Sequence, residues 1–254
     1  MGRKGYNKLN YRVSGNGHPV VFLHGFLESI TMWDYLDFKT QFKKIRFDLA
    51  GHGNSPLDLE QPLSIRSMAK DVKIQLDEMG LDSYYVVGHS MGGYLALELM
   101  KMDQRCTKLV LLNSNFWEDS EEKRKERSRV AEIVTKNKDL FLYEAIPNLF
   151  THPEKFNRDV KQLINEARKI SSDVIARVSL TMSTREDNTA LVLERNEQIL
   201  IIQGDEDPIV PKDTMKGKNT MSLNYIELKN CGHMAHIESA QETVRSLENY
   251  FKIR

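Results

Sequence analysis

The chain has few cysteines and no long apolar run. Only two cysteines, Cys106 and Cys231, occur among 254 residues, which excludes a disulfide framework, and both thiols are expected to be reduced. No stretch is apolar for long enough to cross a bilayer, and residues 1–8 are basic without the apolar segment of a signal peptide. We therefore expect a cytoplasmic protein that does not bind a membrane.

The chain also lacks an excess of charge of either sign. Lys and Arg together number 36, and so do Asp and Glu, which gives a formal net charge of +0. Nucleic acids and anionic membranes are usually attracted by a basic surface, so neither is expected as a partner. The expected partner is a small-molecule substrate, and the protein is expected to be a monomer or a homodimer.

Length and composition are those of an ordinary globular protein. Hydrophobic residues make up 40% and charged residues 28% of the 254 residues, which is enough to bury a substantial core. We therefore expect one structural unit.

Short apolar runs alternate with helical patterns along much of the chain. This alternation predicts an α/β protein with a mostly parallel central sheet flanked by helices. Helices are expected at 64–79, 91–102 and 241–251. Strands are expected at 9–13 (an antiparallel edge strand), 20–23, 45–49, 84–87, 108–112, 199–203 and 224–228.

Residues 116–195 interrupt this alternation. They contain no clear buried strand and are dominated by polar helical patterns such as 119–133. The charged run at 121–127 is interpreted as a solvated helix face with mixed i,i+4 pairs. We predict a helical cap at 116–195, laid over a core formed by residues 1–115 and 196–254.

A possible nucleophile lies between a predicted strand and a predicted helix. Residues 88–93 have the sequence Gly-His-Ser-Met-Gly-Gly, which fits the pattern G-x-S-x-G. In a tight strand-to-helix turn, small neighbours let the backbone hold Ser90 above the sheet. The N-terminus of the following helix would then face an oxyanion formed by attack of Ser90.

Acyl transfer needs a second main-chain donor near the first. The loop His24-Gly25-Phe26 follows the strand at 20–23, so the N–H of Phe26 can join that of Met91 in an oxyanion hole. His24 is interpreted as a residue that stabilises this turn, because it would lie on the oxyanion side of Ser90.

The serine needs a base, and imidazole has a suitable pKa. His233 is the candidate because it lies in a loop between the last strand and the terminal helix. His236 is the nearby competitor and is interpreted as a structural or pocket residue. His52 and His89 lie beside glycines and are interpreted as braces of tight turns.

The histidine in turn needs an acceptor for its second nitrogen. Residues 204–208 have the sequence Gly-Asp-Glu-Asp-Pro and follow the strand at 199–203. Asp207 is preferred because a residue before proline is extended, which can project its side chain towards the sheet; Asp205 is the alternative. The chain order Ser90, Asp207, His233 is that of α/β-hydrolase triads.

Several motifs together resemble the α/β-hydrolase superfamily over nearly the whole chain. Besides residues 88–93, they are 21–26 (the oxyanion strand and loop), 48–55 (D-x-x-G-x-G-x-S), 204–211 (the acid loop) and 232–233 (the histidine loop). The resemblance implies a serine hydrolase of the esterase, lactonase or C–C hydrolase-like group, with a Ser-His-Asp triad and no cofactor. It also implies a helical cap inserted after the sixth core strand. No metal site is predicted.

Hydrolysis of small carboxylic esters, lactones or thioesters through an acyl-enzyme on Ser90 is the expected activity. The same triad resembles that of C–C bond hydrolases and of the menaquinone-pathway synthase. That chemistry wants cations for substrate carboxylates, which Arg168, Arg177 or Arg185 could supply. A non-catalytic ligand-binding protein is the third possibility.

Apolar side chains of the predicted cap and of the loops around the sheet could form the substrate pocket. The same side chains could equally be ordinary core residues. They are Phe26, Trp33, Phe116, Trp117, Phe141, Phe150, Ile209 and Met234.

Overall fold

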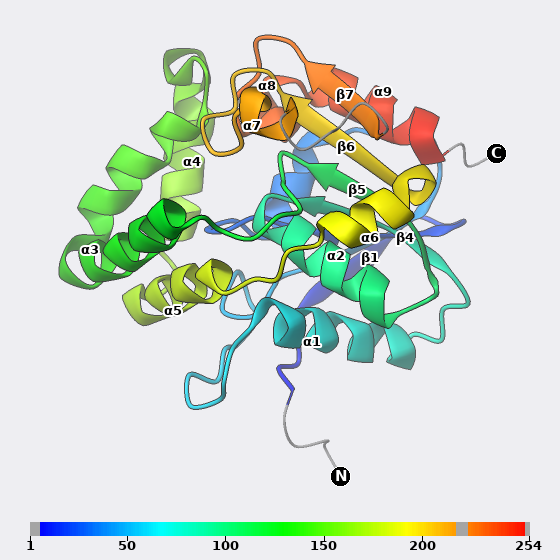
Figure 1. The fold of residues 1–254 in the computed structure, drawn as a ribbon, viewed down its shortest axis with the longest axis horizontal. Helices are drawn as coiled ribbons and strands as arrows, with labels where there is room; N and C mark the ends of the chain where they lie inside the picture. Colours follow the sequence, from blue (N-terminus) through cyan, green and yellow to red (C-terminus); the bar gives the residue numbers. More distant parts are fainter. Residues whose placement is uncertain (1–5, 217–222, 252–254) are drawn as a thin grey trace.

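A seven-stranded sheet with the order β1-β3-β2-β4-β5-β6-β7 forms the centre of the computed structural model, which describes residues 6–216 and 223–251 (Figure 1). β1 (Tyr11–Ser14) pairs antiparallel with β3 (Lys43–Phe47), and the other neighbouring strands are parallel. The remaining strands are β2 (Pro19–Leu23), β4 (Tyr84–His89), β5 (Cys106–Leu112), β6 (Ile199–Gly204) and β7 (Asn224–Leu228). The predicted mostly parallel sheet is confirmed.

The central strands are continuous apolar runs because helices cover both faces of the sheet. Every residue of β6 is buried, for example. β3 ends two residues earlier than predicted, at Phe47. Beyond it, the Asp48 carboxylate accepts the N–H of Ile30 at 2.8 Å, and the N–H of Leu49 donates to His24 Nε2 at 2.9 Å. Residues 48 and 49 make these contacts beyond the end of the ladder between β2 and β3.

Two helices pack on one face of the sheet, and two other elements pack on the opposite face. α1 (Ile65–Glu78) and α2 (Met91–Met102) share a hydrophobic cluster with the first face. The 3-10 helix η1 (Ile30–Tyr35) and α9 (Ala240–Phe251) share a second cluster with the other face. α1 begins after a capping box in which Ser64 and Ser67 each accept the other's backbone N–H. The predicted helices are confirmed within one residue at each end.

The segment between β5 and β6 is helical. It contains α3 (Glu121–Ala145), η2 (Pro147–Leu149), η3 (Pro153–Phe156), α4 (Asn157–Ala167), α5 (Ser172–Ser183), α6 (Thr189–Glu194) and η4 (Asn196–Gln198). Figure 1 shows α3, α4 and α5 together beyond the end of the sheet towards which the parallel strands point. The short helices α7 (Lys212–Lys216) and α8 (Ala235–Glu238) follow β6 and β7.

The helical segment follows β5, so only five strands of the described chain precede it instead of the expected six. The expected number came from the family pattern, whereas this sheet begins with the single antiparallel strand β1 beside β3. That residues 116–195 form a cap over a core of residues 1–115 and 196–254, within one structural unit, stays a prediction.

α3 is bent at Asn137, whose φ of −153° and ψ of 81° are not helical. The Asn137 side chain accepts the N–H of Leu140 at 3.1 Å and so caps the second half of the helix. Lys138 fixes the bend against the segment after α4, because its Nζ donates to the carbonyls of Arg168 and Ile170, each at 2.8 Å.

Cys106 and Cys231 are both buried and carry free thiols. Within residues 6–216 and 223–251, no helix combines the length and the apolar composition that a membrane span requires.

Candidate active site

The turn between β4 and α2 holds Ser90 at the carboxyl end of the sheet. Its φ of 50° and ψ of −116° are strained for a residue with a side chain. The turn needs glycine on both sides, because a Cβ on Gly88 would lie 2.4 Å from the Gly92 oxygen and one on Gly92 would lie 2.1 Å from the Leu23 oxygen. Residues 88–93 therefore have the expected strand–turn–helix geometry.

His233 lies in the loop between β7 and α8, beside Ser90. Its Nε2 is 2.9 Å from Ser90 Oγ, and its Nδ1 is 3.0 and 2.9 Å from the two carboxylate oxygens of Asp207. An ionised carboxylate only accepts hydrogen bonds, so Nδ1 carries the ring proton and Nε2 is free to accept the serine proton. The His233 N–H donates to the Leu149 carbonyl at 2.8 Å, so the inserted helices also hold this loop.

Asp207 is buried and held by several donors besides His233. Burial alone would raise the pKa of Asp207, but the His233 ring, the Asn113 amide and the N–H of Val210 together hold that pKa below its ordinary value. The carboxylate is therefore ionised at neutral pH. The donors are Asn113 Nδ2 at 2.9 Å, Gln203 Nε2 at 2.6 Å, and the N–H groups of Ile209 at 2.8 Å and Val210 at 3.0 Å.

The alternative acid, Asp205, has other partners. It accepts the N–H of Cys231 at 3.4 Å and lies 3.7 Å from Lys229 Nζ. The structure thus brings Ser90, His233 and Asp207 together and leaves Asp205 out of the site.

Three other histidines have structural contacts. His24 Nε2 accepts the N–H of Leu49 at 2.9 Å, and His52 Nδ1 donates to the Ala50 carbonyl at 3.1 Å, so both brace turns as interpreted. His236 is buried, which lowers its pKa to about 3, and its ring nitrogens have no hydrogen-bond partner among the described residues. Among the described residues, Ser90 Oγ contacts the ring of His233 and makes no hydrogen bond with His236.

The two segments that carry the main-chain amides of the predicted oxyanion hole run next to Ser90. A Cβ on Gly25 would be 3.2 Å from the Ser90 Cβ, so the loop that carries Phe26 runs next to the nucleophile. Met91 is the first residue of α2, where N–H groups have no partner within the helix. Neither the Phe26 nor the Met91 N–H donates to another described residue. That these two amides form an oxyanion hole stays a prediction.

A buried ion pair between Glu28 and His89 lies under the site, and no local pattern in the sequence indicates it. His89 Nδ1 is 2.8 Å from Glu28 Oε2, which also accepts the N–H of Gly25 at 2.6 Å. Burial would raise the pKa of Glu28, but the charge of His89 and its hydrogen bond to Glu28 outweigh burial and lower that pKa to about 2. Burial would likewise lower the pKa of His89, yet Glu28 and the His233 carbonyl raise it. The pair is therefore charged.

Glu28, His89 and His236 also offer atoms that could ligate a metal, all within 4.8 Å of one another. Both ring nitrogens of His89 already make hydrogen bonds, however, to Glu28 and to the His233 carbonyl. A metal ion would have to break these bonds, so we assign the cluster to support of the site.

A cavity of about 290 Å³ lies over Ser90 and His233. Of the side chains predicted to bind substrate, Phe26, Phe141, Ile209 and Met234 line it. The first half of α3 contributes Lys123, Arg127 and Val130, and α5 contributes Ser179 and Met182. The cavity is therefore formed by the sheet edge and the inserted helices together.

Four apolar side chains predicted for this pocket lie elsewhere. Trp33 is 0% exposed and packs on Phe22, with ring centroids 5.1 Å apart, because η1 turns it onto the sheet face that α9 covers. Phe116 and Trp117 line a separate cavity over α2, where the chain leaves β5. Phe150 packs on Phe156 among the inserted helices, at 5.5 Å between ring centroids.

The arginines considered as carboxylate ligands are also placed elsewhere. Arg168 pairs with Asp139 at 3.0 Å on the surface, and Arg177 Nη2 donates to the Gln61 carbonyl at 3.2 Å. Arg185 is buried and pairs with Asp119. None of the three lines the cavity over Ser90.

Known protein sequences resemble this chain over most of its length. A family model described as the alpha/beta hydrolase fold matches residues 18–240. A putative 2-succinyl-6-hydroxy-2,4-cyclohexadiene-1-carboxylate synthase of Bacillus subtilis is 26% identical over 249 residues, which cover 91% of this chain and 90% of the relative.

Solved structures share the fold at lower identity. A thermophilic esterase from Thermogutta terrifontis superposes with a TM-score of 0.89 at 24% identity, covering 99% of this chain and 96% of the other. An enol-lactonase from Burkholderia xenovorans superposes with a TM-score of 0.84 at 18% identity, covering 97% of each chain.

Proposed function

The chain belongs to the α/β-hydrolase fold family, and from this we propose that it is a serine hydrolase that cleaves small carboxylic esters, lactones or thioesters. The observation that carries the proposal is the contact of His233 Nε2 with Ser90 Oγ at 2.9 Å, with Nδ1 held by the Asp207 carboxylate. This is the geometry of a nucleophile, a base and the group that orients the base.

In the proposed first half-reaction, Ser90 Oγ attacks the carbonyl carbon while its proton passes to His233 Nε2. The negative charge that develops on the carbonyl oxygen is held by the N–H groups of Phe26 and Met91. The His233 imidazolium then protonates the leaving oxygen or sulfur, and the bond to the leaving group breaks. An acyl-Ser90 ester remains.

In the second half-reaction, His233 removes a proton from water, which attacks the acyl carbon. The new tetrahedral oxyanion uses the same two amides, and Ser90 leaves with the proton from His233. The acid is released and the enzyme is restored. We propose that residues 116–195 act as a cap, because α3 and α5 line the cavity over Ser90.

Hydrolysis of p-nitrophenyl butyrate by the Ser90→Ala variant tests this proposal. Loss of the nucleophile is expected to lower kcat by roughly 10³-fold or more. Ser128→Ala is the matched control, because this exposed serine of α3 donates to the Arg124 carbonyl at 3.2 Å and does not line the cavity over Ser90. A fluorophosphonate is expected to label Ser90 in the native protein, and unchanged turnover by Ser90→Ala would overturn the proposal.

A synthase or C–C bond hydrolase is the second candidate, and the Bacillus subtilis relative, with 91% of this chain matched, favours it. In such a reaction, Ser90 and His233 would act mainly in proton transfer. Turnover of a vinylogous diketone acid together with a negligible esterase rate would favour this candidate. Tight ligand binding without any turnover would instead favour a non-catalytic binding protein.

A further inference from the structure

Two cationic side chains interrupt the otherwise largely apolar wall of the cavity over Ser90. Lys123 and Arg127 lie one turn apart on α3, and both line the cavity. They also line an adjoining, more polar cavity, and Tyr94 and Ile209 complete the boundary between the two. A charge at an apolar wall costs free energy unless an opposite charge or a hydrogen-bond acceptor meets it.

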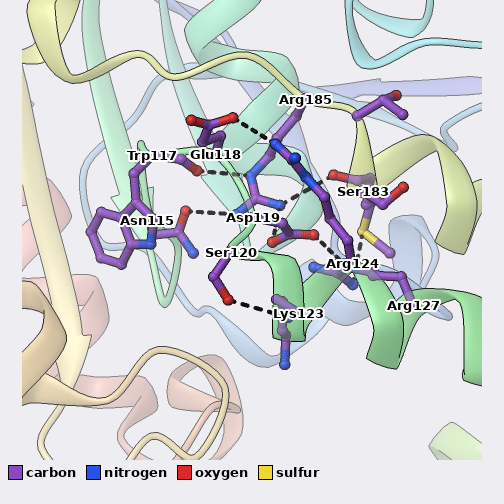
Figure 2. A network of polar contacts seen from close by, with 12 residues as sticks. Asn115, Trp117, Glu118, Asp119, Ser120, Lys123, Arg124, Arg127, Ser183 and Arg185 are labelled. Atoms are coloured by element: carbon purple, nitrogen blue, oxygen red, sulfur yellow. Dashed lines mark hydrogen bonds and ion pairs between the residues drawn. The ribbon is translucent and has the colours of Figure 1, made fainter.

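Each guanidinium nitrogen of the neighbouring Arg185 already has a hydrogen-bond partner. Its guanidinium pairs with Asp119, donates to the carbonyls of Trp117 at 3.0 Å and Met182 at 3.2 Å, and donates to Asn115 Oδ1 at 3.2 Å (Figure 2). The Tyr94 ring lies 4.2 Å from its central carbon. These contacts make Arg185 a link between the end of α5 and the chain that leaves β5.

Arg127 has far fewer acceptors than Arg185. Its Nε donates to Asp119 Oδ2 at 3.1 Å, and its Nη1 reaches only the Met182 sulfur, at 3.5 Å (Figure 2). A thioether sulfur is a weak acceptor, and Nη2 donates to no other residue in the described part of the chain. One edge of the guanidinium is therefore available to a ligand.

The charges of this cluster do not cancel. Asp119 is buried and is the single carboxylate shared by the guanidiniums of Arg127 and Arg185. Lys123 adds a third cation, and its partner Glu126 has a side chain that is 62% exposed, so water screens that pair. An excess of positive charge thus lies at the wall of the cavity that contains Ser90.

We propose that the substrate carries a carboxylate, and that Arg127, assisted by Lys123, binds it while the carbonyl under attack lies at Ser90. The inference rests on the proposed function, because it names the class of ester that the site accepts. A planar guanidinium with one free edge suits a carboxylate. Such a group would supply the negative charge that the cluster lacks.

A purely structural role for Arg127 makes a different prediction. If this arginine only ties α3 to Asp119, its loss disturbs the whole cavity, and all esters are affected alike. If it binds substrate, its loss affects only esters that carry the charge. The ratio of kcat/KM values for a charged ester and its neutral analogue separates the two roles.

The experiment uses two matched ester pairs, because the carboxylate could lie on either side of the bond that breaks. For the acyl side, mono-p-nitrophenyl glutarate is compared with p-nitrophenyl methyl glutarate. For the leaving-group side, 4-butyryloxybenzoate is compared with its methyl ester. The full-length protein is assayed as wild type, Arg127→Met, Arg127→Lys and Arg124→Met. Arg124 is the control, because it lies on the same helix, pairs with Glu118 and does not line the cavity.

In at least one pair, we expect the wild type to prefer the charged ester by about tenfold or more, as for a hydrogen bond between charged groups. Arg127→Met should abolish this preference through KM, so that the kcat/KM values of the charged and neutral esters become similar. Arg127→Lys should keep part of the preference, and Arg124→Met should keep all of it.

A wild type with no preference in either pair would overturn the inference, whether or not any variant folds. A preference that Arg127→Met leaves intact, or an equal loss for both esters, would also overturn it. Absence of Ser90-dependent release from every ester would contradict the proposed function itself, and the inference would fall with it.

Discussion

His89 donates the hydrogen of its Nε2 to the main-chain oxygen of His233, across 3.0 Å. A carbonyl only accepts, so Nε2 carries a proton, and Nδ1 carries one as well because it lies 2.8 Å from a carboxylate oxygen of Glu28. Because Glu28 also accepts the N–H of Gly25, the pair connects the oxyanion loop to the histidine loop.

Replacing Glu28 by glutamine should disturb both loops. One oxygen of Glu28 accepts from both Gly25 and His89, whereas an amide nitrogen in its place accepts from neither and an amide oxygen leaves the histidine without a counter-charge. We expect a loss of about 1–3 kcal/mol in the free energy of unfolding, measured in urea, and a lower kcat. Glu121→Gln, on the surface of α3, is the control and should change neither quantity.

Replacing Asp207 by asparagine should lower kcat strongly with little change in the fold. An amide that donates to His233 would favour the wrong tautomer, and a loss of roughly 10³- to 10⁴-fold is expected. Asp205→Asn serves as the control, since Asp205 contacts Cys231 and Lys229 instead. Equal losses of kcat for the two variants would contradict the assignment of Asp207 as the acid.

The free energy of unfolding should fall as the pH drops from about 6.5 towards 4.5. Burial lowers the pKa values of His52 and His236 to about 3. Between about pH 6.5 and 4.5, these two histidines therefore bind protons in the unfolded chain and remain neutral in the folded chain. Each such group contributes a slope of about 1.4 kcal/mol per pH unit. The lowered pKa values of Glu28 and Asp207 act only below this range, and the raised pKa of His89 acts only above it.

Urea unfolding of the wild type and of His236→Leu at several pH values checks this expectation. In the variant, the free energy of unfolding should depend less steeply on pH, by roughly 1.4 kcal/mol per pH unit. The difference in stability at pH 7.5 isolates the change in packing, and an unaltered slope would show that His236 does not titrate as expected.

Substitution of Phe141 should change the substrate preference, whereas substitution of Trp33 should change the stability. Phe141 lines the cavity over Ser90, so Phe141→Ala should raise the kcat/KM of p-nitrophenyl octanoate relative to the butyrate several-fold. Trp33 is buried against Phe22 on the other face of the sheet. Trp33→Phe should therefore lower the free energy of unfolding by about 1–3 kcal/mol and leave the ratio unchanged. A shift of chain-length preference in Trp33→Phe would speak against this placement.

The features that could be predicted from the sequence are those with local signals. Apolar runs between turn residues locate the strands, and the glycines around Ser90 fix a turn that only small neighbours allow. Asp207 could be separated from Asp205 because a proline follows it, and the structure places only Asp207 against His233.

Features that depend on distant contacts could not be predicted in this way. Asn113 lies 94 positions from Asp207, and nothing in its neighbourhood indicates that its amide holds the acid. Trp33 and Phe116 were wrong as pocket residues because the direction of an aromatic side chain depends on the turn that carries it. Arg127 lies in a run of charges typical of a solvated helix face, and only the packing of α3 over the sheet edge reveals its place in the cavity.

Ser90 and His233 are 143 positions apart in the chain, and the whole helical segment lies between them. A nascent chain that has not yet reached His233 therefore lacks the base that would activate Ser90. Contacts of such large sequence separation tend to form late in folding. The reactivity of the Ser90 hydroxyl should thus report completion of the entire tertiary structure, and an incompletely synthesised chain should not react with esters.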